Sequence, residues 1–422
     1  MKILVVGGGA REHTLVWKLA QSPHTTGLFA VPGNAGTAQT AHNLDIRAED
    51  TDALVNAVRK NGIELVVVGP EGPLAAGMVD RFYELGIPAF GPTRLAAEIE
   101  SSKVFAKDLM TRHGIPCAHS VAFSDYSEAR AYVGRKSPPV VIKADGLAAG
   151  KGVVVADSLE QALETLAEFM QSRRLGASGD RVVVEEYLSG REMSAFVFTD
   201  GGTVLPIASA CDYKRAYDGD RGPNTGGMGS YSPPPFLTPE LSGTVLDSIM
   251  KPTVSALARE GRTYRGVLYG GLMVTAEGPR VVEFNARLGD PETQVILPLL
   301  KTDLVDIMLA VMEGRLDRMQ VECYQGACVG VVMASGGYPG GYQIGFPITG
   351  LGDLDEDVLV FHAGTRQNGG GREVLTAGGR VLTVVARGDT IDQARRKAYA
   401  NVSRIYFQDC HYRKDIALVA ES

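Results

Sequence analysis

Two oxygen donors stand at the spacing of a metal site in residues 281–292, which read VVEFNARLGDPE. Glu283 and Asn285 lie two positions apart in an apolar run, so on a β-strand both side chains would face the same way. Magnesium takes a few such oxygens and completes its shell with phosphates and water. Arg287 follows, where a guanidinium can neutralise charge on a transferring phosphoryl group. The segment predicts magnesium-assisted phosphoryl transfer; an amphipathic strand with a salt-bridged arginine is the alternative.

A glycine-rich loop, residues 145–152 (DGLAAGKG), follows Lys143 at the end of another apolar run. It is not a P-loop, because a Walker A loop has four residues between its glycines and Ser or Thr after its Lys, whereas Gly152 follows Lys151 here. Backbone N–H groups of such a loop can still close over a polyphosphate, with Lys143 as a point charge beside it. Lys103, at a helix start that disfavours cations, is expected to have an anionic partner. The alternative is a flexible hairpin tip with solvated lysines.

Residues 182–192 (VVVEEYLSGRE) form an apolar run that ends in carboxylates. Backbone at such a strand end can bind the edge of an adenine, with Val184 and Leu188 beside the ring and a later carboxylate on the ribose hydroxyls. Ordinary strand-end acids are the alternative.

Three glycine turns and one long loop are candidates for holding further substrates. The turns are 7–9 (GGG), 32–37 (PGNAGT) and 69–72 (GPEG), each at the end of a predicted parallel strand, where such sheets bind ligands. The first is not a dinucleotide fingerprint, since Glu12 replaces its third glycine and no acid ends the second strand, which argues against NAD. It can still hold an anion at a helix start, or simply pack a helix on a strand. In the loop, residues 212–215 (DYKR) offer an acid for an ammonium group and cations for carboxylate or phosphate.

The elements that must position these residues fall into three blocks. Residues 1–99 alternate apolar runs (3–6, 28–31, 65–68) with helices near 12–21, 51–61 and 74–85, which predicts a parallel sheet. The next block is an α+β region with a capped helix after Ser102, strands at 140–143, 153–156 and 182–188, an irregular stretch over 212–235, a long helix, and strands at 266–275 and 280–285. From about residue 322, short strands with turns and one helix near 391–405 predict a separate C-terminal domain.

Composition agrees with a multidomain enzyme. At about 150 residues per domain, 422 residues give roughly three domains. A net charge of −7 without a basic run gives no support for a nucleic-acid or membrane partner. Five scattered cysteines without a CxxC pair favour a reducing compartment. Because no run approaches the ~18 apolar residues of a membrane span and no signal segment is visible, we expect a cytoplasmic protein.

Taken together, these residues resemble the ATP-grasp ligases, and within them the glycinamide ribonucleotide synthetase family of purine biosynthesis. The resemblance spans the chain in the strings GGGAREH, PGNAGT, VGPE, VIKADGLAAGKGV, VEEYLSGRE, CDYKR, GPNTGGMGSYSP, EFNARLGDPETQ, GVVMASGGYPG and FHAGT. It implies an α/β and α+β multidomain fold: a Rossmann-like N-terminal domain (1–100), a two-lobed ATP-grasp core (101–321) with a mobile lid lobe at about 117–190, and a small C-terminal α+β domain (322–422). Many ATP-grasp relatives carry another metal-binding acid on the preceding strand, where this chain has Gly270-Gly271-Leu272.

The resemblance also implies roles for individual residues. ATP would bind Lys103, Lys143, Gly146, Gly150, Gly152, Glu185, Glu186, Tyr187, Leu188 and Glu192. Phosphoribosylamine and glycine would bind Gly9, Arg11, Asn34, Ala35, Gly36, Thr37, Pro70, Glu71, Asp212, Lys214, Asn224, Arg287 and Asp290. Catalytic roles would belong to Arg287, Lys143, Gly152 and Asp212, and Glu283 and Asn285 would bind Mg²⁺ or Mn²⁺.

The expected reaction joins glycine to phosphoribosylamine through glycyl phosphate, with ATP as the energy source and glycinamide ribonucleotide, ADP and phosphate as products. The expected partners are these small molecules, and the expected assembly is a monomer or a small homo-oligomer. The alternatives are another ATP-grasp ligase or carboxylase that uses formate or bicarbonate, a non-catalytic nucleotide-binding protein, and a Rossmann oxidoreductase.

Overall fold

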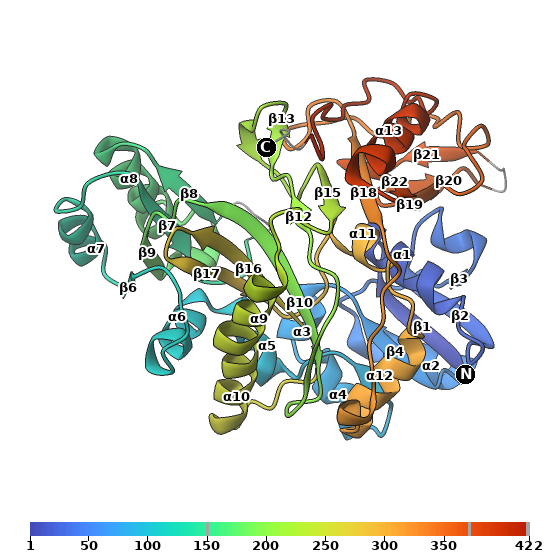
Figure 1. Cartoon of the computed structure of the whole chain (residues 1–422), viewed down its shortest axis with the longest axis horizontal. Helices are drawn as coiled ribbons and strands as arrows, with labels where there is room; N and C mark the ends of the chain where they lie inside the picture. The colour runs from blue at the N-terminus through green and yellow to red at the C-terminus, as the bar shows by residue number, and fades with distance from the viewer. Residues whose placement is uncertain (149–151, 370–372, 419–422) are drawn as a thin grey trace.

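The N-terminal part of the chain forms the predicted parallel sheet. The computed structural model describes residues 1–148, 152–369 and 373–418. Its first sheet has five parallel strands in the order β3-β2-β1-β4-β5 (Figure 1). The central strands are buried on both faces, which accounts for their continuous Val, Ile and Leu runs. The strands are β1 (Lys2–Gly7), β2 (Gly27–Pro32), β3 (His42–Asn43), β4 (Leu65–Val68) and β5 (Ala89–Phe90).

The helices of this part differ from the prediction over residues 74–85 and at α5 (Arg94–Ser101), which was not predicted. The single helix expected near 74–85 is wrong, because α3 ends at Ala75 and α4 begins at Met78. Gly77 between them has a φ of +86°, a left-handed conformation that cannot continue a right-handed helix. The helices are α1 (Ala10–Leu19), α2 (Thr51–Asn61), α3 (Glu71–Ala75), α4 (Met78–Glu84) and α5 (Arg94–Ser101).

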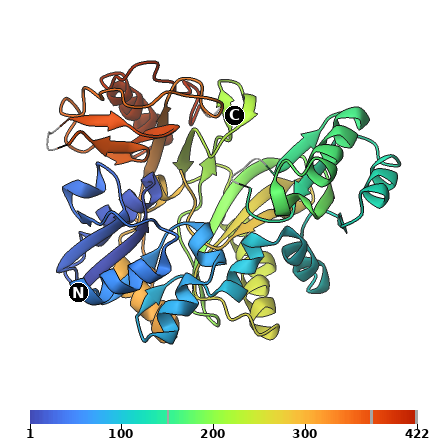
Figure 2. The ribbon, with the colours of Figure 1, turned by 180° about the vertical axis from the view of Figure 1, so that it is seen from behind.

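A second body, which we call the outer lobe (residues 120–186), follows helix α6 (Lys103–Arg112). Ser102 caps α6 as predicted, since its hydroxyl accepts a hydrogen bond from the Phe105 N–H at 3.1 Å. The lobe projects from the rest of the molecule and encloses an apolar cluster of its own (Figures 1 and 2). Its antiparallel sheet has the order β6-β9-β7-β8. The elements are β6 (Ser120–Phe123), α7 (Tyr126–Val133), β7 (Val140–Ala144), β8 (Val153–Ala156), α8 (Leu159–Leu166), a π-helical turn (Ala167–Gln171) and β9 (Val182–Glu186).

A third sheet, in the order β11-β10-β16-β17, lies between the outer lobe and the N-terminal sheet. Its strands are β10 (Arg191–Thr199), β11 (Val204–Pro206), β16 (Gly266–Thr275) and β17 (Gly278–Asn285). The predicted long helix is α9 (Pro239–Val245) and α10 (Lys251–Arg259), joined by a π-helical turn (Leu246–Met250).

The C-terminal sheet takes in part of the chain that we expected to be irregular. The prediction for 212–235 is wrong, because this stretch contains strands β12 (Cys211–Asp212), β13 (Arg215–Tyr217), β14 (Arg221–Asn224) and β15 (Gly229–Ser232). Strands β12 and β15 join the sheet β12-β15-β18-β22-β19, on which helix α13 packs. The remaining elements are α11 (Thr293–Ile296), α12 (Leu304–Glu313), β18 (Ala327–Ala334), β19 (Leu359–His362), β20 (Thr365–Gln367), β21 (Val374–Thr376), β22 (Arg380–Gly388) and α13 (Ile391–Val402).

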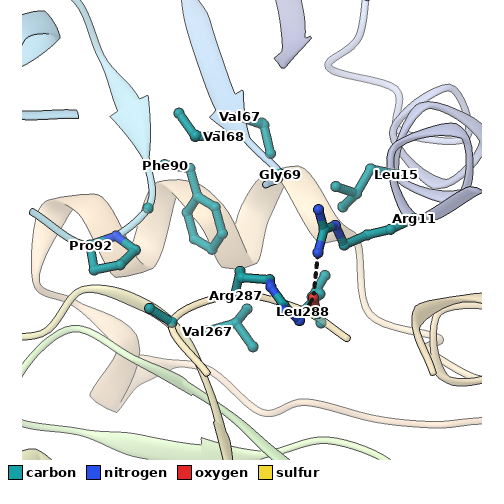
Figure 3. Close-up of a pocket in the computed structure, with 12 residues that line it drawn as sticks. Arg11, Leu15, Val67, Val68, Gly69, Phe90, Pro92, Val267, Arg287 and Leu288 are labelled. Carbon is teal, nitrogen blue, oxygen red and sulfur yellow. Dashed lines mark hydrogen bonds between the residues drawn. The ribbon is translucent and has the colours of Figure 1, made fainter. Parts of the chain in front are cut away.

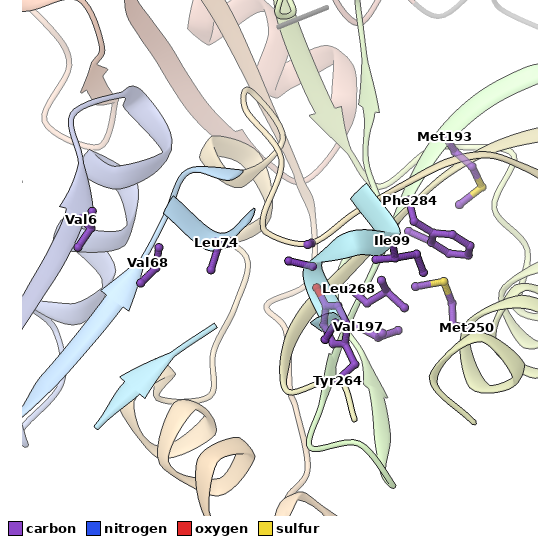
Figure 4. Packing of buried hydrophobic residues seen from close by; sticks show 14 of the residues in the cluster. Val6, Val68, Leu74, Ile99, Met193, Val197, Met250, Tyr264, Leu268 and Phe284 are labelled. Atoms are coloured by element: carbon purple, nitrogen blue, oxygen red, sulfur yellow. The ribbon is translucent and has the colours of Figure 1, made fainter. Parts of the chain in front are cut away.

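One apolar cluster joins the N-terminal sheet to the third sheet. It runs from Val68 and Leu74 to Ile99, Leu268 and Phe284 (Figure 4). These two parts therefore share a buried core, whereas the outer lobe has a separate one. Over the described residues, no helix combines the length and the apolar character that a membrane crossing requires.

Candidate active site

Strand β17 carries both predicted metal ligands and places one of them, Glu283, in the wall of a small pocket. Antiparallel pairing places Glu283 opposite Gly271 and Asn285 opposite Tyr269. Glu283 lines the pocket together with Glu192, Asp212 and Lys214. Four residues from three separate segments of the chain thus line one cavity, and three of them are carboxylates.

Positive charge keeps the Glu283 carboxylate ionised. Burial acts to raise the pKa of Glu283, but the charges of Lys214, Lys143 and Lys103 outweigh it and lower the pKa. Asp212 behaves in the opposite way, since burial raises its pKa to about 7 although Lys214 opposes the shift. Lys214 also lies 2.9 Å from Glu192 Oε2, so this one ammonium group serves two carboxylates of the pocket.

Two predicted phosphate-binding lysines reach the same region from different elements. Lys143, at the end of β7, is buried and donates a hydrogen bond to the Val282 carbonyl at 2.8 Å. Its Nζ lies 3.1 Å from Glu185 Oε2. Lys103 at the start of α6 donates to the Gly146 carbonyl at 2.9 Å, and the charge of Glu283 acts on it. The direct partner of Lys103 is therefore a neutral carbonyl, and the strongest anionic influence among the described residues is the Glu283 carboxylate at longer range.

Sequence reasoning missed Lys107, a buried lysine whose Nζ lies 2.9 Å from Glu185 Oε2. It stands one helical turn after Lys103 on α6, so the i, i+4 spacing was the available signal. With Lys143 on its other side, Glu185 is a buried carboxylate between two ammonium groups.

The predicted adenine segment separates into buried and exposed residues. The Glu185 carboxylate is directed at the two lysines. Glu186 accepts hydrogen bonds from the His119 N–H at 2.8 Å and from Arg280 at 3.2 Å. Tyr187 is exposed and Leu188 half-buried, so their surfaces are available to a ligand.

The predicted glycine loop is described at both ends. Gly146 follows Asp145, which is held by Arg181 at 2.5 Å and by the Ser102 hydroxyl at 3.1 Å. Gly152 accepts a hydrogen bond from the Ala144 N–H at 2.8 Å, which closes the base of the loop. Gly150 lies outside the described residues.

At the first glycine turn, the Glu12 side chain folds back over the start of α1. Its Oε2 accepts from the Gly9 N–H at 2.8 Å, and its Oε1 lies 2.6 Å from Arg11 Nε. The carboxylate thus takes the place at the helix start where a dinucleotide would put its phosphates. This geometry agrees with the argument against NAD made from the sequence.

At the second turn, Asn34 holds the backbone of its neighbours. Its Oδ1 accepts from the Gly36 N–H at 2.8 Å and from the Thr37 N–H at 3.0 Å. Its Nδ2 donates to the Gly8 carbonyl at 3.0 Å, so the first and second turns are joined by one buried side chain. Ala35 lies buried inside this turn.

Arg287 lies where the third turn meets β17. Its guanidinium is 3.1 Å from Glu71 Oε2 and 2.9 Å from Glu100 Oε1, and it makes a long contact of 3.5 Å to Asn285 Oδ1. Burial acts to raise the pKa of Glu71, but Arg287 and Arg11 lower it to about 2. Figure 3 shows Arg11 and Arg287 at one small pocket beside Gly69, the residue before Pro70. Sequence reasoning missed Glu100, whose pKa is raised by burial.

The remaining predicted substrate residues are Asp290 and Asn224. Asp290 Oδ2 lies 3.2 Å from Arg380, a C-terminal residue that sequence reasoning missed. The same guanidinium donates to the Asp290 carbonyl at 2.9 Å and to the Gly226 carbonyl at 2.5 Å. Asn224 is exposed on hairpin β13–β14 and is not among the residues that line the pocket of Glu283.

Glu283 and Asn285 offer a metal ion one carboxylate and one amide oxygen. Within residues 1–148, 152–369 and 373–418, no group of three or more His, Cys, Asp and Glu side chains is arranged to hold a metal. One carboxylate and one amide oxygen nevertheless suit magnesium, which draws its other ligands from phosphates and water. The residues therefore fit a magnesium ion that arrives with a nucleotide.

Comparisons with known proteins cover nearly the whole chain. Residues 1–100, 101–293 and 328–419 match the N domain, the ATP-grasp (A) domain and the C domain of phosphoribosylglycinamide synthetase. A phosphoribosylamine–glycine ligase of Allochromatium vinosum is 49% identical over 420 residues, 99% of this chain and 98% of that protein. The crystal structure of the Thermotoga maritima phosphoribosylamine–glycine ligase has a TM-score of 0.86 at 35% identity and covers 99% of this chain and 100% of its own.

A more distant likeness shows the fold alone. The biotin carboxylase domain of Hydrogenobacter thermophilus 2-oxoglutarate carboxylase, solved with MgADP and bicarbonate, has a TM-score of 0.76 at 16% identity and covers 97% of this chain and 91% of that one. The predicted multidomain ATP-grasp architecture is confirmed. The chain belongs to the phosphoribosylglycinamide synthetase family of ATP-grasp ligases, whose members include the phosphoribosylamine–glycine ligases.

Proposed function

We propose that this ligase joins the carboxyl group of glycine to the amine of phosphoribosylamine and converts ATP to ADP and phosphate. Family membership over the full chain supports the reaction. The observation that carries the proposal is the pocket in which Glu283, Asp212, Lys214 and Glu192 meet, with the charges of Lys143 and Lys103 acting on it. Carboxylates and ammonium groups of this kind are the chemistry that would bind the two ends of an amino acid and the phosphates of ATP.

In the first proposed step, a glycine carboxylate oxygen attacks the γ-phosphorus of ATP. The new O–P bond forms as the bond from the γ-phosphorus to the bridging oxygen breaks, and ADP leaves. Lys143 and Lys103 would hold the phosphate oxygens, and Arg287 would stabilise the charge that builds up on the transferred group. Glu283 and Asn285 would hold Mg²⁺, or Mn²⁺ in its place, which neutralises phosphate charge when bound.

In the second proposed step, the amine nitrogen of phosphoribosylamine attacks the acyl carbon of glycyl phosphate. The C–N bond forms, the C–O bond breaks as phosphate leaves, and the nitrogen gives up one proton to the departing phosphate, which leaves the amide. Asp212 would hold the glycine ammonium group, and Lys214 the carboxylate. The turns at 7–9 and 33–37 with Arg11, Glu71, Asn224 and Asp290 would hold phosphoribosylamine. No side-chain nucleophile is needed, and alignment alone can supply about 7–11 kcal/mol.

The outer lobe is proposed to act as the lid. Because its apolar cluster is separate from the main core, it can move as a unit without opening that core. Closure would exclude water from glycyl phosphate, which hydrolyses readily. The boundaries that go with this proposal are 1–100, 101–321 and 322–422, with the lid at about 117–190. We also propose a cytoplasmic enzyme, in keeping with its five free cysteines, that works as a monomer or small homo-oligomer.

The test is an ADP-release assay with ATP, Mg²⁺, glycine and freshly made phosphoribosylamine, in which each substrate is left out in turn. We expect release only with the full set. Release with formate or bicarbonate in place of glycine would favour a different ATP-grasp reaction. Binding of ATP without release in any mixture would favour a non-catalytic nucleotide-binding protein.

A further inference from the structure

The C-terminal domain meets the N-terminal glycine turns through the edge strand of its sheet. β19 pairs with β22 on one side only, with His362 opposite Leu382. In a β-strand, the N–H and C=O of one residue point to the same side. At His362 both groups point away from the sheet and towards the N-terminal domain, so their partners must come from there.

Two buried side chains of the N-terminal domain supply those partners. The His362 N–H donates to His13 Nδ1 at 2.8 Å, and the His362 carbonyl accepts from Asn34 Nδ2 at 2.7 Å. His13 therefore carries its proton on Nε2, because Nδ1 must be free to accept. Burial and the neighbouring His362 lower the pKa of His13 to about 3, which keeps the ring neutral.

The same two side chains hold the turn at 33–37. Asn34 binds the backbone N–H groups of Gly36 and Thr37 and the carbonyl of Gly8. Gly36 packs directly on the imidazole, since a Cβ on Gly36 would lie 2.2 Å from His13 Cε1. The ring is also held edge-on against Phe361 at a centroid distance of 5.6 Å. His13 is thus fixed on one side by the C-terminal strand and forms one wall of the turn on the other.

We propose that His13 is a positioning residue. Its Nδ1 accepts a hydrogen bond from the His362 backbone N–H, and this contact holds the C-terminal domain against the two glycine turns and fixes the turn at 33–37 for phosphoribosylamine. The inference deepens the proposed function and rests on it in assigning that turn to this substrate. His13 touches no reacting atom in this scheme and acts through the turn. ATP and glycine, held at Lys143, Asp212 and their neighbours, should not depend on it.

Three substitutions in the full-length enzyme test the role of His13 Nδ1 as a hydrogen-bond acceptor. His13→Asn places its amide oxygen where Nδ1 stands, His13→Gln places the amide one bond farther out, and His13→Leu has a similar size with no acceptor. We expect His13→Gln and His13→Leu to raise KM for phosphoribosylamine about tenfold, equivalent to about 1.4 kcal/mol, while KM for ATP and glycine stays within twofold. His13→Asn should resemble the parent enzyme.

Hydrogen exchange at the Gly36 and Thr37 amides provides a readout that needs no substrate. Exchange at these amides should be faster in His13→Gln and His13→Leu than in His13→Asn. Equal behaviour of the Asn and Gln variants in both measurements, or a fall in kcat with unchanged KM, would overturn the positioning role. If the parent enzyme releases no ADP with the full substrate set, the proposed function fails, and the exchange comparison still decides whether His13 orders the turn.

Discussion

Arg287 combines a proposed catalytic charge with a structural ion pair. We expect Arg287→Ala to lower turnover more than tenfold with little change in ATP affinity, because its charge is needed most when the phosphoryl group transfers. The same change leaves the buried Glu100 without the guanidinium at 2.9 Å, so the free energy of unfolding should fall by roughly 3–5 kcal/mol. Steady-state kinetics and urea unfolding measure the two effects.

A double variant separates these effects. Adding Glu100→Gln removes the unpaired charge, so it should restore part of the lost stability and none of the lost turnover. Recovery of turnover together with stability would mean that Arg287 acts only through the fold.

Glu283 is the charged member of the proposed magnesium pair. Glu283→Gln removes the charge but keeps an oxygen, so we expect the Mg²⁺ concentration for half-maximal ADP release to rise by about tenfold or more. Glu277→Gln is the matched control, since Glu277 lies exposed at the turn between β16 and β17 and forms an ion pair across that turn with Arg280. An unchanged metal titration in Glu283→Gln would remove Glu283 from the site.

Among the elements, α3 and α4 show how one glycine divides a helix. Gly77→Ala places a Cβ at a φ of +86°, where an L-residue costs about 1–2 kcal/mol, partly offset by lower entropy of the unfolded chain. We expect the free energy of unfolding to fall by about 1 kcal/mol, measured by urea unfolding. Gly72→Ala is the control: it lies within α3 with no atom within 4 Å of its added Cβ, so stability should stay the same or rise. A loss in Gly72→Ala equal to that in Gly77→Ala would contradict the argument.

Sequence patterns predicted the helices and strands well where residues close together in the sequence determine them. The runs 65–68, 153–156 and 266–275 are strands with those bounds, and 51–61 is a helix with those bounds, because apolar period and flanking turn residues are local properties. The stretch 212–235 was missed because β12 and β15 are strands only through pairing with each other and with β18, about 100 positions on in the case of β15.

The residues of the candidate site also divide into those with a local sequence signal and those that matter through distant partners. Glu283, Asn285 and Lys143 could be selected from their spacing next to strands. Glu100 and Arg380 could not be chosen from local pattern, because their importance comes from partners far along the chain: Arg380 meets Asp290, and Glu100 accepts a hydrogen bond from the Ala286 N–H at 2.7 Å. Lys107 had a local signal in its spacing from Lys103, but its partner Glu185 is also distant in the sequence. A single sequence does not state which distant side chains meet.

At the scale of the whole molecule, contacts between domains make stability depend on pH. The folded pKa values of His13 and His362, about 3 and about 4, lie below the ordinary 6.5, chiefly because burial disfavours the charged rings. The unfolded chain therefore binds more protons than the folded chain below pH 6.5, and the free energy of unfolding falls as the pH falls. Each histidine can contribute up to about 1.4 kcal/mol per pH unit between pH 6 and 4.

The difference in pH-dependent stability between the parent enzyme and His13→Asn measures the contribution of His13 alone. Asp212 works in the opposite direction, because its raised pKa of about 7 makes its stabilising effect fade as the pH rises, but it is present in both proteins and cancels in their difference. Urea unfolding at pH 7.5, 6.5, 5.5 and 5.0 should therefore show a shallower loss of stability on acidification in His13→Asn than in the parent. If the two slopes coincide, His13 does not remain neutral between the domains, and the contact from its Nδ1 to the His362 backbone is not maintained in solution.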